Sequence, residues 1–111
     1  MDHERYQLKA QILKALAHPS RLIMVDALSD GEKCVCELQE IVGADMSTVS
    51  KHLSVMRNAG LVQSRKVGLQ VFYRLKVPCI LQFFGCVEAV MASRYAPELN
   101  AAAANCCREQ E

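Results

Sequence analysis

The stretch Asp45-Met-Ser-Thr-Val-Ser-Lys-His-Leu-Ser-Val-Met-Arg-Asn-Ala-Gly60 decides the fold that this sequence predicts. Val49, Leu53 and Met56 recur at the spacing of one helical stripe, which predicts a helix packed inward along that side. Asp45 suits the position before the first turn, and Gly60 suits the position just after the last turn. The remaining side chains in the first half of the helix are short, polar or cationic; these are Ser47, Thr48, Ser50, Lys51 and His52.

Charge is distributed unevenly around this helix. No Asp or Glu occurs between Met46 and Lys76, whereas six Lys or Arg residues lie in that segment. A cationic surface of this kind favours contact with the phosphates of a polyanion such as nucleic acid. The alternative is an ordinary solvated helix, which is common among short Ser- and Thr-rich sequences.

Length and composition predict one globular domain. The chain has 111 residues, of which 51% are hydrophobic, too many for a disordered chain. The charged N-terminus lacks the apolar stretch of a signal peptide, and no run is long enough to span a membrane. We therefore expect a cytoplasmic protein with no membrane partner. In that compartment the six cysteines are expected to be thiols that bind metals or undergo redox chemistry.

The order of elements predicts a winged helix-turn-helix. A short helix at 35–42, a turn at Gly43-Ala44 and the helix at 45–60 form the helix-turn-helix pattern. Two β-rich runs at 61–67 and 69–75 then predict a two-stranded hairpin, the wing. Further helices are expected at 4–17, where Tyr6, Leu8 and Ile12 belong to an amphipathic pattern, at 19–28 and at 78–93. Pro19 suits the first turn of the 19–28 helix, and its Leu22 and Ile23 are expected to be largely buried. The predicted fold class is therefore α+β, mostly α, with five helices and a hairpin. Residues 1–94 are expected to form the DNA-binding and dimerisation domain, and 95–111 a tail. The apolar surface of the last helix predicts a homodimer.

Five motifs in order resemble one family. They are Leu16-Ala-His-Pro-Ser-Arg-Leu-Ile23, Cys34-Val-Cys-Glu-Leu38, Ser47-Thr-Val-Ser-Lys-His-Leu53, Met56-Arg-Asn-Ala-Gly-Leu-Val62 and Val71-Phe-Tyr-Arg-Leu75. Together they resemble the arsenic- and metal-sensing repressors of the ArsR/SmtB family over about residues 8–92. The resemblance implies a transcriptional repressor and not an enzyme. Such a repressor binds operator DNA as a dimer and leaves it when an inducer binds.

The helix and the resemblance together indicate the residues that contact DNA. Ser47, Thr48, Ser50, Lys51 and His52 are expected to face the major groove, where such side chains bond base edges or phosphates. Arg57, Arg65 and Lys66 are expected to hold phosphates. A dimer should read an inverted repeat with half-sites about 10 base pairs apart, or a multiple of that spacing. His18, beside Pro19, is expected to cap a helix.

Cys34 and Cys36 are the candidate inducer ligands. Thiolates prefer soft ions, and the start of a helix stabilises their negative charge. Lone cysteines are otherwise mostly small buried apolar residues. The resemblance implies arsenite or antimonite as the inducer. In a regular helix, residues two positions apart point about 200° away from each other. Two sulfurs on one ion must come within roughly 4 Å of each other, which an undistorted helix does not allow. Our hypothesis is therefore that binding unwinds the first turn of the 35–42 helix and so displaces the DNA-reading helix.

A third sulfur for arsenite is not evident. The family often supplies it three residues after the second cysteine, where this chain has Gln39. One alternative is binding by two sulfurs with a hydroxide retained on the arsenic. The other is a third thiolate from Cys106 or Cys107 in the tail, from the same chain or its partner. An incidental exposed pair is the alternative for these two residues. Cys79 and Cys86 are expected to pack at an interface, with an auxiliary metal site as the alternative.

Other functions are weighed on the same residues. A thiol-based redox regulator is the main alternative, in which Cys34/Cys36 or Cys106/Cys107 oxidise and switch DNA binding. A cadmium- or lead-responsive repressor is another, although no cysteine precedes Cys34. A zinc site on the last helix is disfavoured, because 78–93 contains Glu88 and neither His nor Asp. A thiol oxidoreductase is disfavoured, because the pair is Cys-x-Cys without a surrounding β-α-β pattern.

Overall fold

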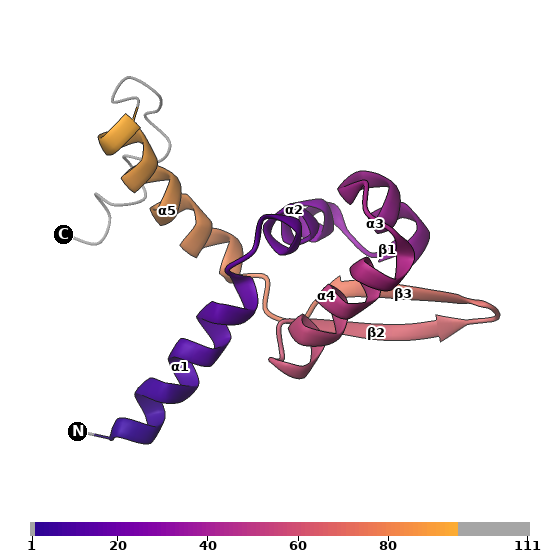
Figure 1. The fold of residues 1–111 in the computed structure, drawn as a ribbon, viewed down its shortest axis with the longest axis horizontal. Helices are drawn as coiled ribbons and strands as arrows, with labels where there is room; N and C mark the ends of the chain where they lie inside the picture. Colours follow the sequence, from indigo (N-terminus) through magenta and orange to yellow (C-terminus); the bar gives the residue numbers. More distant parts are fainter. Residues whose placement is uncertain (1, 96–111) are drawn as a thin grey trace. The chain divides into compact units, whose positions relative to one another are not determined.

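The computed structural model describes residues 2–95. Over these residues it contains five α-helices, one 3-10 turn and a three-stranded sheet (Figure 1). In chain order the elements are α1 (His3–Leu16), α2 (Pro19–Ala27), η1 (Leu28–Asp30), β1 (Lys33–Cys34), α3 (Val35–Val42), α4 (Met46–Asn58), β2 (Val62–Val67), β3 (Gln70–Leu75) and α5 (Ile80–Tyr95). The predicted fold class, a winged helix-turn-helix with five helices and a hairpin, is confirmed.

The chain divides into two compact units, one ending at Val77 and the other starting at Pro78. The first unit holds α1–α4 and the whole sheet, while α5 belongs to the second. No described helix is both long and apolar enough to cross a bilayer.

The core of the first unit forms where α2, α3, α4 and the sheet meet. The predicted inward stripe of α4 is confirmed, because Val49, Leu53 and Met56 are completely buried. Met24 and Val25 of α2 and Leu38 of α3 are also completely buried. This packing fixes one side of α4 in the core and leaves its other side exposed.

The helix ends follow their local sequences. Asp45 precedes α4 with an extended backbone, and Ser47 Oγ donates a hydrogen bond to its carboxylate at 3.0 Å. Gly43 ends α3 in the left-handed region, at φ 80°, and Gly60 lies in the same region after α4. The imidazole of His18 caps α2 by accepting from the backbone N–H of Ser20 at 3.1 Å, which confirms its predicted role.

The sheet has a strand that the sequence did not predict. β2 and β3 form the predicted antiparallel hairpin, from the pair Val62–Leu75 to the pair Val67–Gln70. The two-residue strand β1 pairs with the other edge of β3, so the strand order is β1-β3-β2. Since β1 contains Cys34, the candidate inducer segment is part of the same sheet as the wing.

Two expectations about helix packing need correction. Leu22 and Ile23 were expected to be buried in the second helix, but they are 39% and 42% exposed. The apolar side of α1 is likewise only partly covered, since Tyr6 and Leu8 are about half exposed. Only its last two residues, Ala15 and Leu16, are buried. The first unit therefore carries apolar surface on α1 and α2 that its own packing does not cover.

Candidate DNA-binding surface and thiol site

The exposed side of α4 holds most of the side chains predicted to read DNA. Ser47, Thr48, Ser50 and Lys51 are all exposed, and they occupy the first two turns of the helix. The pKa of the Asp45 carboxyl is lowered, chiefly by the hydroxyl of Thr48 and then by that of Ser47. The Ser47 hydroxyl is therefore oriented by the Asp45 carboxylate, although it remains at the surface.

His52 does not belong to this exposed surface. It is only 9% exposed and faces α2, so its expected contact with the major groove is not compatible with the structure. Its Nδ1 accepts a hydrogen bond from Nε of Arg21 at 3.0 Å, and its ring lies 4.4 Å from that of His18. Burial lowers the pKa of His52, and the nearby charges of His18 and Arg21 lower it further. His52 therefore packs α4 against α2 and is not part of the exposed row.

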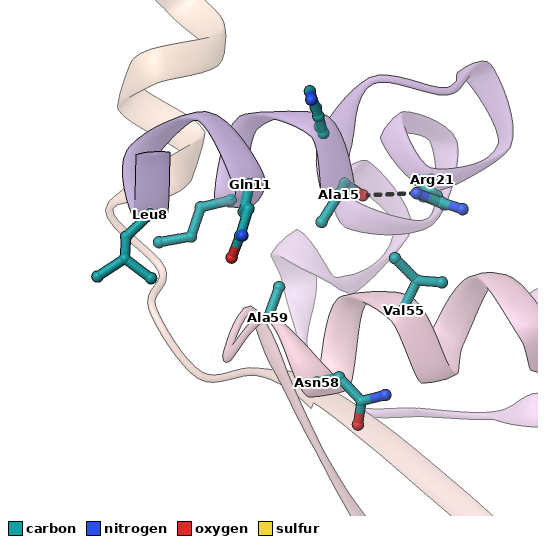
Figure 2. Close-up of a pocket in the computed structure, with 9 residues that line it drawn as sticks. Leu8, Gln11, Ala15, Arg21, Val55, Asn58 and Ala59 are labelled. Atoms are coloured by element: carbon teal, nitrogen blue, oxygen red, sulfur yellow. Dashed lines mark hydrogen bonds between the residues drawn. The ribbon is translucent and has the colours of Figure 1, made fainter. Parts of the chain in front are cut away.

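Arg21 joins three helices at this point. Besides His52 of α4, its guanidinium reaches α1, where Nη1 donates to the carbonyl oxygen of Ala15 at 3.3 Å (Figure 2). The adjoining groove, of about 500 Å³, is walled by α1 and α4; among its lining residues are Leu8, Gln11, Val55 and Asn58. The orientation of α4 therefore depends on a polar contact between Arg21 and His52, two residues that are 31 positions apart in the sequence.

The wing presents its cations differently from what the sequence suggested. Lys66 is exposed near the hairpin turn, as a phosphate contact requires. Arg65, by contrast, donates from Nε and Nη2 to the two carboxylate oxygens of Glu32, both at 2.7 Å. It also lies over the ring of Phe72, with its guanidinium carbon 5.4 Å from the ring centroid. Arg65 must leave Glu32, or share it, before it can bind a phosphate.

The thiol segment begins at the sheet edge. Cys34 pairs with Phe72 in the β1–β3 ladder and is 8% exposed. It is also the residue that caps α3, with an extended backbone at φ −79° and ψ 161°. Its backbone N–H donates to the carboxylate of Glu37 at 3.1 Å, and the two residues form a capping box. Cys36, within α3, is exposed.

This arrangement corrects the proposed geometry of inducer binding. The two cysteines do not share a helix, because Cys34 precedes α3 and is extended. The argument that a regular helix must unwind to bring both sulfurs to one ion therefore does not apply. The obstacle is instead burial, since the Cys34 side chain is covered while Cys36 faces solvent. An ion held by both sulfurs would therefore require the capping box at Cys34 to open, and not a helical turn to unwind.

The described residues do not assemble a complete soft-ion site. Between residues 2 and 95, no cluster of three or more His, Cys, Asp or Glu side chains is arranged to hold a metal. Gln39 occupies the position where a third cysteine would follow Cys36, and its side chain supplies no sulfur. Cys106 and Cys107 lie outside the described residues. The segment thus offers two sulfurs. Sulfur is the ligand type that a thiophilic ion prefers, but a three-thiolate centre needs one more.

Known proteins with similar sequences are transcriptional regulators. The model of the family described as "Bacterial regulatory protein, arsR family" matches residues 18–64. The biofilm growth-associated repressor of Xylella fastidiosa is 44% identical over 66 residues, which cover 60% of this chain and 58% of that protein. The repressor of the same name from Agrobacterium fabrum is 40% identical over 91 residues, covering 82% of this chain and 75% of that protein.

Solved structures agree with this assignment. The crystal structure of Rv0081 from Mycobacterium tuberculosis superposes with a TM-score of 0.76 at 31% identity, covering 89% of this chain and all of that one. A homodimeric winged helix-turn-helix DNA-binding domain from Mycobacterium bovis gives 0.74 at 25% identity, covering 90% and 95%. A possible transcriptional regulator for arsenical resistance gives 0.61 at 34% identity, covering 72% and 83%.

These similarities extend well beyond the helix-turn-helix. The Agrobacterium repressor is aligned over most of both chains, and the Mycobacterium tuberculosis structure covers 89% of this chain. The related proteins are regulators of transcription and not enzymes, which agrees with the expectation from the sequence. The chain belongs to the arsR family of bacterial regulatory proteins.

Proposed function

We propose that this chain is a homodimeric transcriptional repressor that binds an inverted-repeat operator through α4 and the hairpin. The supporting observation is the exposed row Ser47, Thr48, Ser50 and Lys51 on a helix whose opposite side is completely buried. A helix held in this way can enter a major groove without losing its packing. The segment from Met46 to Lys76 adds six cations and no carboxylate, which suits a phosphate backbone.

Two observations support dimerisation. The similar domain from Mycobacterium bovis is described as homodimeric. In this chain α1 leaves Tyr6, Leu8 and Leu13 about half exposed, an apolar surface that a second copy would cover. Two copies related by a two-fold axis place two α4 helices on one side of the dimer, which explains why the operator should be an inverted repeat.

Operator selection tests this proposal. Random-sequence duplexes are incubated with the full chain, and the bound fraction is sequenced after several rounds. The proposal predicts enrichment of two inverted half-sites whose centres lie about 10 base pairs, or a multiple of it, apart. Fluorescence anisotropy with the selected duplex and a shuffled duplex then measures specificity. Failure to enrich any sequence, with equal affinity for both duplexes, rejects the proposal.

We further propose that release from the operator is triggered by a thiophilic ion, arsenite or antimonite, at Cys34 and Cys36. Two sulfurs two residues apart, one in the sheet edge and one in α3, suit a soft ligand. The third sulfur is assigned to Cys106 or Cys107. Binding takes Cys34 out of its capping box, and α3 is in contact with α4 across the helix-turn-helix. By linkage, the ion and the operator weaken each other's binding by the same factor.

Alkylation tests where the ion binds. Cys36 and Cys79 are both exposed in the single chain, and the rate at which each reacts with iodoacetamide is first measured in the reduced protein without arsenite. One equivalent of arsenite should protect Cys36, while Cys79 serves as the internal control and stays reactive. Mass spectrometry of tryptic peptides quantifies both. If Cys36 continues to react as fast as Cys79, the ion is not bound at this position.

A redox switch is the second candidate, and the two-sulfur content of the thiol segment favours it. A disulfide requires only two thiols, which would give two protons and two electrons to a peroxide and leave two molecules of water. The same burial of Cys34 must be relieved first. Release of the operator by hydrogen peroxide, without any response to arsenite, would establish this alternative in place of ion sensing.

A further inference from the structure

A cationic groove lies at the base of the hairpin, where β2 begins and β3 ends. It has a volume of about 420 Å³ and is lined by cations from three places in the chain. Arg57 comes from the last turn of α4, Arg65 from β2, and Arg74 and Lys76 from the end of β3 and just beyond it. The lining contains one carboxylate, that of Glu32. None of these five side chains is among the buried residues of the core.

The strand register explains why the cations converge. Gln63 pairs with Arg74 and Arg65 pairs with Phe72, so these four residues share one face of the hairpin. The opposite face carries the buried residues Val62, Tyr73 and Leu75. Successive side chains of a strand point to opposite faces of the sheet. Because the inner face of this hairpin is apolar, its cations lie together on the outer face.

The groove is strongly unbalanced in charge. Four cations and one carboxylate leave three positive charges, and among the described residues neither Arg57, Arg74 nor Lys76 forms an ion pair. Glu32 accepts both of its 2.7 Å hydrogen bonds from Arg65. The hydrogen bond from Arg65 lowers the pKa of Glu32, and the charges of Arg65 and Arg74 contribute in the same direction. One anion is therefore already held here by the chain itself.

The groove is separate from the residues that would read bases. Ser47 lies in the first turn of α4 and Arg57 in the last, ten residues further on. At a rise of 1.5 Å per residue this is about 15 Å along the helix. The convergence of Arg57, Arg65, Arg74 and Lys76 is consequently not accounted for by the exposed row on the N-terminal half of α4.

We propose that this groove binds a phosphate group, which competes with the Glu32 carboxylate for Arg65. A tetrahedral dianion offers three or more acceptor oxygens to converging Arg and Lys donors, more than a single carboxylate can. The phosphate belongs either to a free phosphorylated small molecule or to the DNA backbone beyond the half-site; only the second source rests on the proposed function. Glu32 directly precedes β1, so occupancy of the groove also affects the strand that holds Cys34.

Pyrophosphate is the probe for the free source. Calorimetric titration at constant ionic strength compares the wild-type chain with Arg74→Gln, Lys76→Gln and Glu32→Gln. We expect at least five-fold weaker binding in the first two variants and tighter binding in Glu32→Gln, because the competing carboxylate is gone. Arg5→Gln on α1, far from the groove in sequence and exposed, is the charge-matched control and should bind as the wild type does. Circular dichroism confirms that each variant is folded.

The selected operator duplex is the probe for the DNA source. For Arg74→Gln and Lys76→Gln we expect the slope of log affinity against log salt to fall by about 1 relative to Arg5→Gln. A change in either assay supports the phosphate site and identifies its source. If neither variant differs from Arg5→Gln in either assay, the phosphate site is wrong. If the wild type binds pyrophosphate but no DNA, the repressor function fails while the site stands.

Discussion

Cys34 and Phe72 lie directly opposite each other in the β1–β3 ladder. On its other side Phe72 pairs with Arg65 of β2, and Arg65 returns to Glu32, two residues before Cys34. The candidate inducer residue and the wing thus form one closed ring of contacts across the sheet. A change at Cys34 can reach the wing through this ring as well as reaching α4 through α3.

Replacing Cys34 tests its role as a cap. Serine is a better helix cap than cysteine and fits the same space, whereas alanine removes the capping atom. We expect Cys34→Ala to be less stable than Cys34→Ser by about 1 kcal/mol, measured as the free energy of unfolding in urea. Equal stabilities of the two variants would show that a side-chain acceptor at position 34 does not stabilise the start of α3.

Gly43 should be hard to replace, because the turn between α3 and α4 requires a left-handed backbone. Its φ is 80°, and its N–H donates to the carbonyl oxygen of Gln39 at 2.8 Å. A side chain in this region costs about 1–2 kcal/mol, and Asn tolerates it better than Ala. Gly43→Ala should therefore lower the free energy of unfolding more than Gly43→Asn does. The reverse order would contradict the turn geometry.

The pKa of His52 predicts a loss of stability in acid. Because its folded pKa lies below the unfolded value of about 6.5, the unfolded chain binds more protons as pH falls through this range. The free energy of unfolding should then decrease below about pH 6.5. His52→Asn keeps an acceptor for Arg21 but does not titrate, so it should flatten this pH dependence. Urea unfolding between pH 5 and 8 measures the effect.

The control for this experiment is His3→Asn, which removes an exposed histidine near the start of α1. Its pH dependence should match that of the wild type. A wild-type curve that stays level between pH 5 and 6.5, or an unchanged curve in His52→Asn, would show that His52 does not control stability in acid.

Lys51 is the exposed cation in the first half of α4, and it should contact the operator. Lys51→Ala is expected to weaken binding of the selected duplex and to reduce the slope of log affinity against log salt by about 1 if the contact is to a phosphate. Loss of specificity with an unchanged slope would indicate a base contact instead. Lys9→Ala on α1 should alter neither quantity. A Lys51→Ala protein that binds like Lys9→Ala would exclude Lys51 from the interface.

Much of the fold could be predicted because its signals are local. The 35–42 helix was predicted with its observed bounds, and the other helices with shifts of one or two residues at most ends. Periodicity identified the buried stripe of α4, and the side chain of His18 beside Pro19 indicated the cap of α2. Each of these features depends on residues within a few positions of one another.

The errors concern contacts between distant segments. β1 has only two residues, and it forms because Lys33 and Cys34 pair with a strand about forty residues later. A segment this short has no periodicity from which a strand could be predicted. His52 looks polar in sequence, but Arg21 satisfies it in the interior. Arg65 looks like a phosphate contact until Glu32 is found beside it. Arg74 and Lys76 were seen as cations, yet their convergence with Arg57 required the hairpin register.

Release of the operator by arsenite is the most direct test of the central claim, that soft-ion chemistry at Cys34 and Cys36 ends repression. Arsenite is titrated into the protein bound to the selected fluorescent duplex, with wild type, Cys34→Ser, Cys36→Ser and the control Cys79→Ser. We predict a fall in anisotropy for the wild type and Cys79→Ser, and no release for the other two. Undiminished release in both Cys34→Ser and Cys36→Ser would contradict the claim.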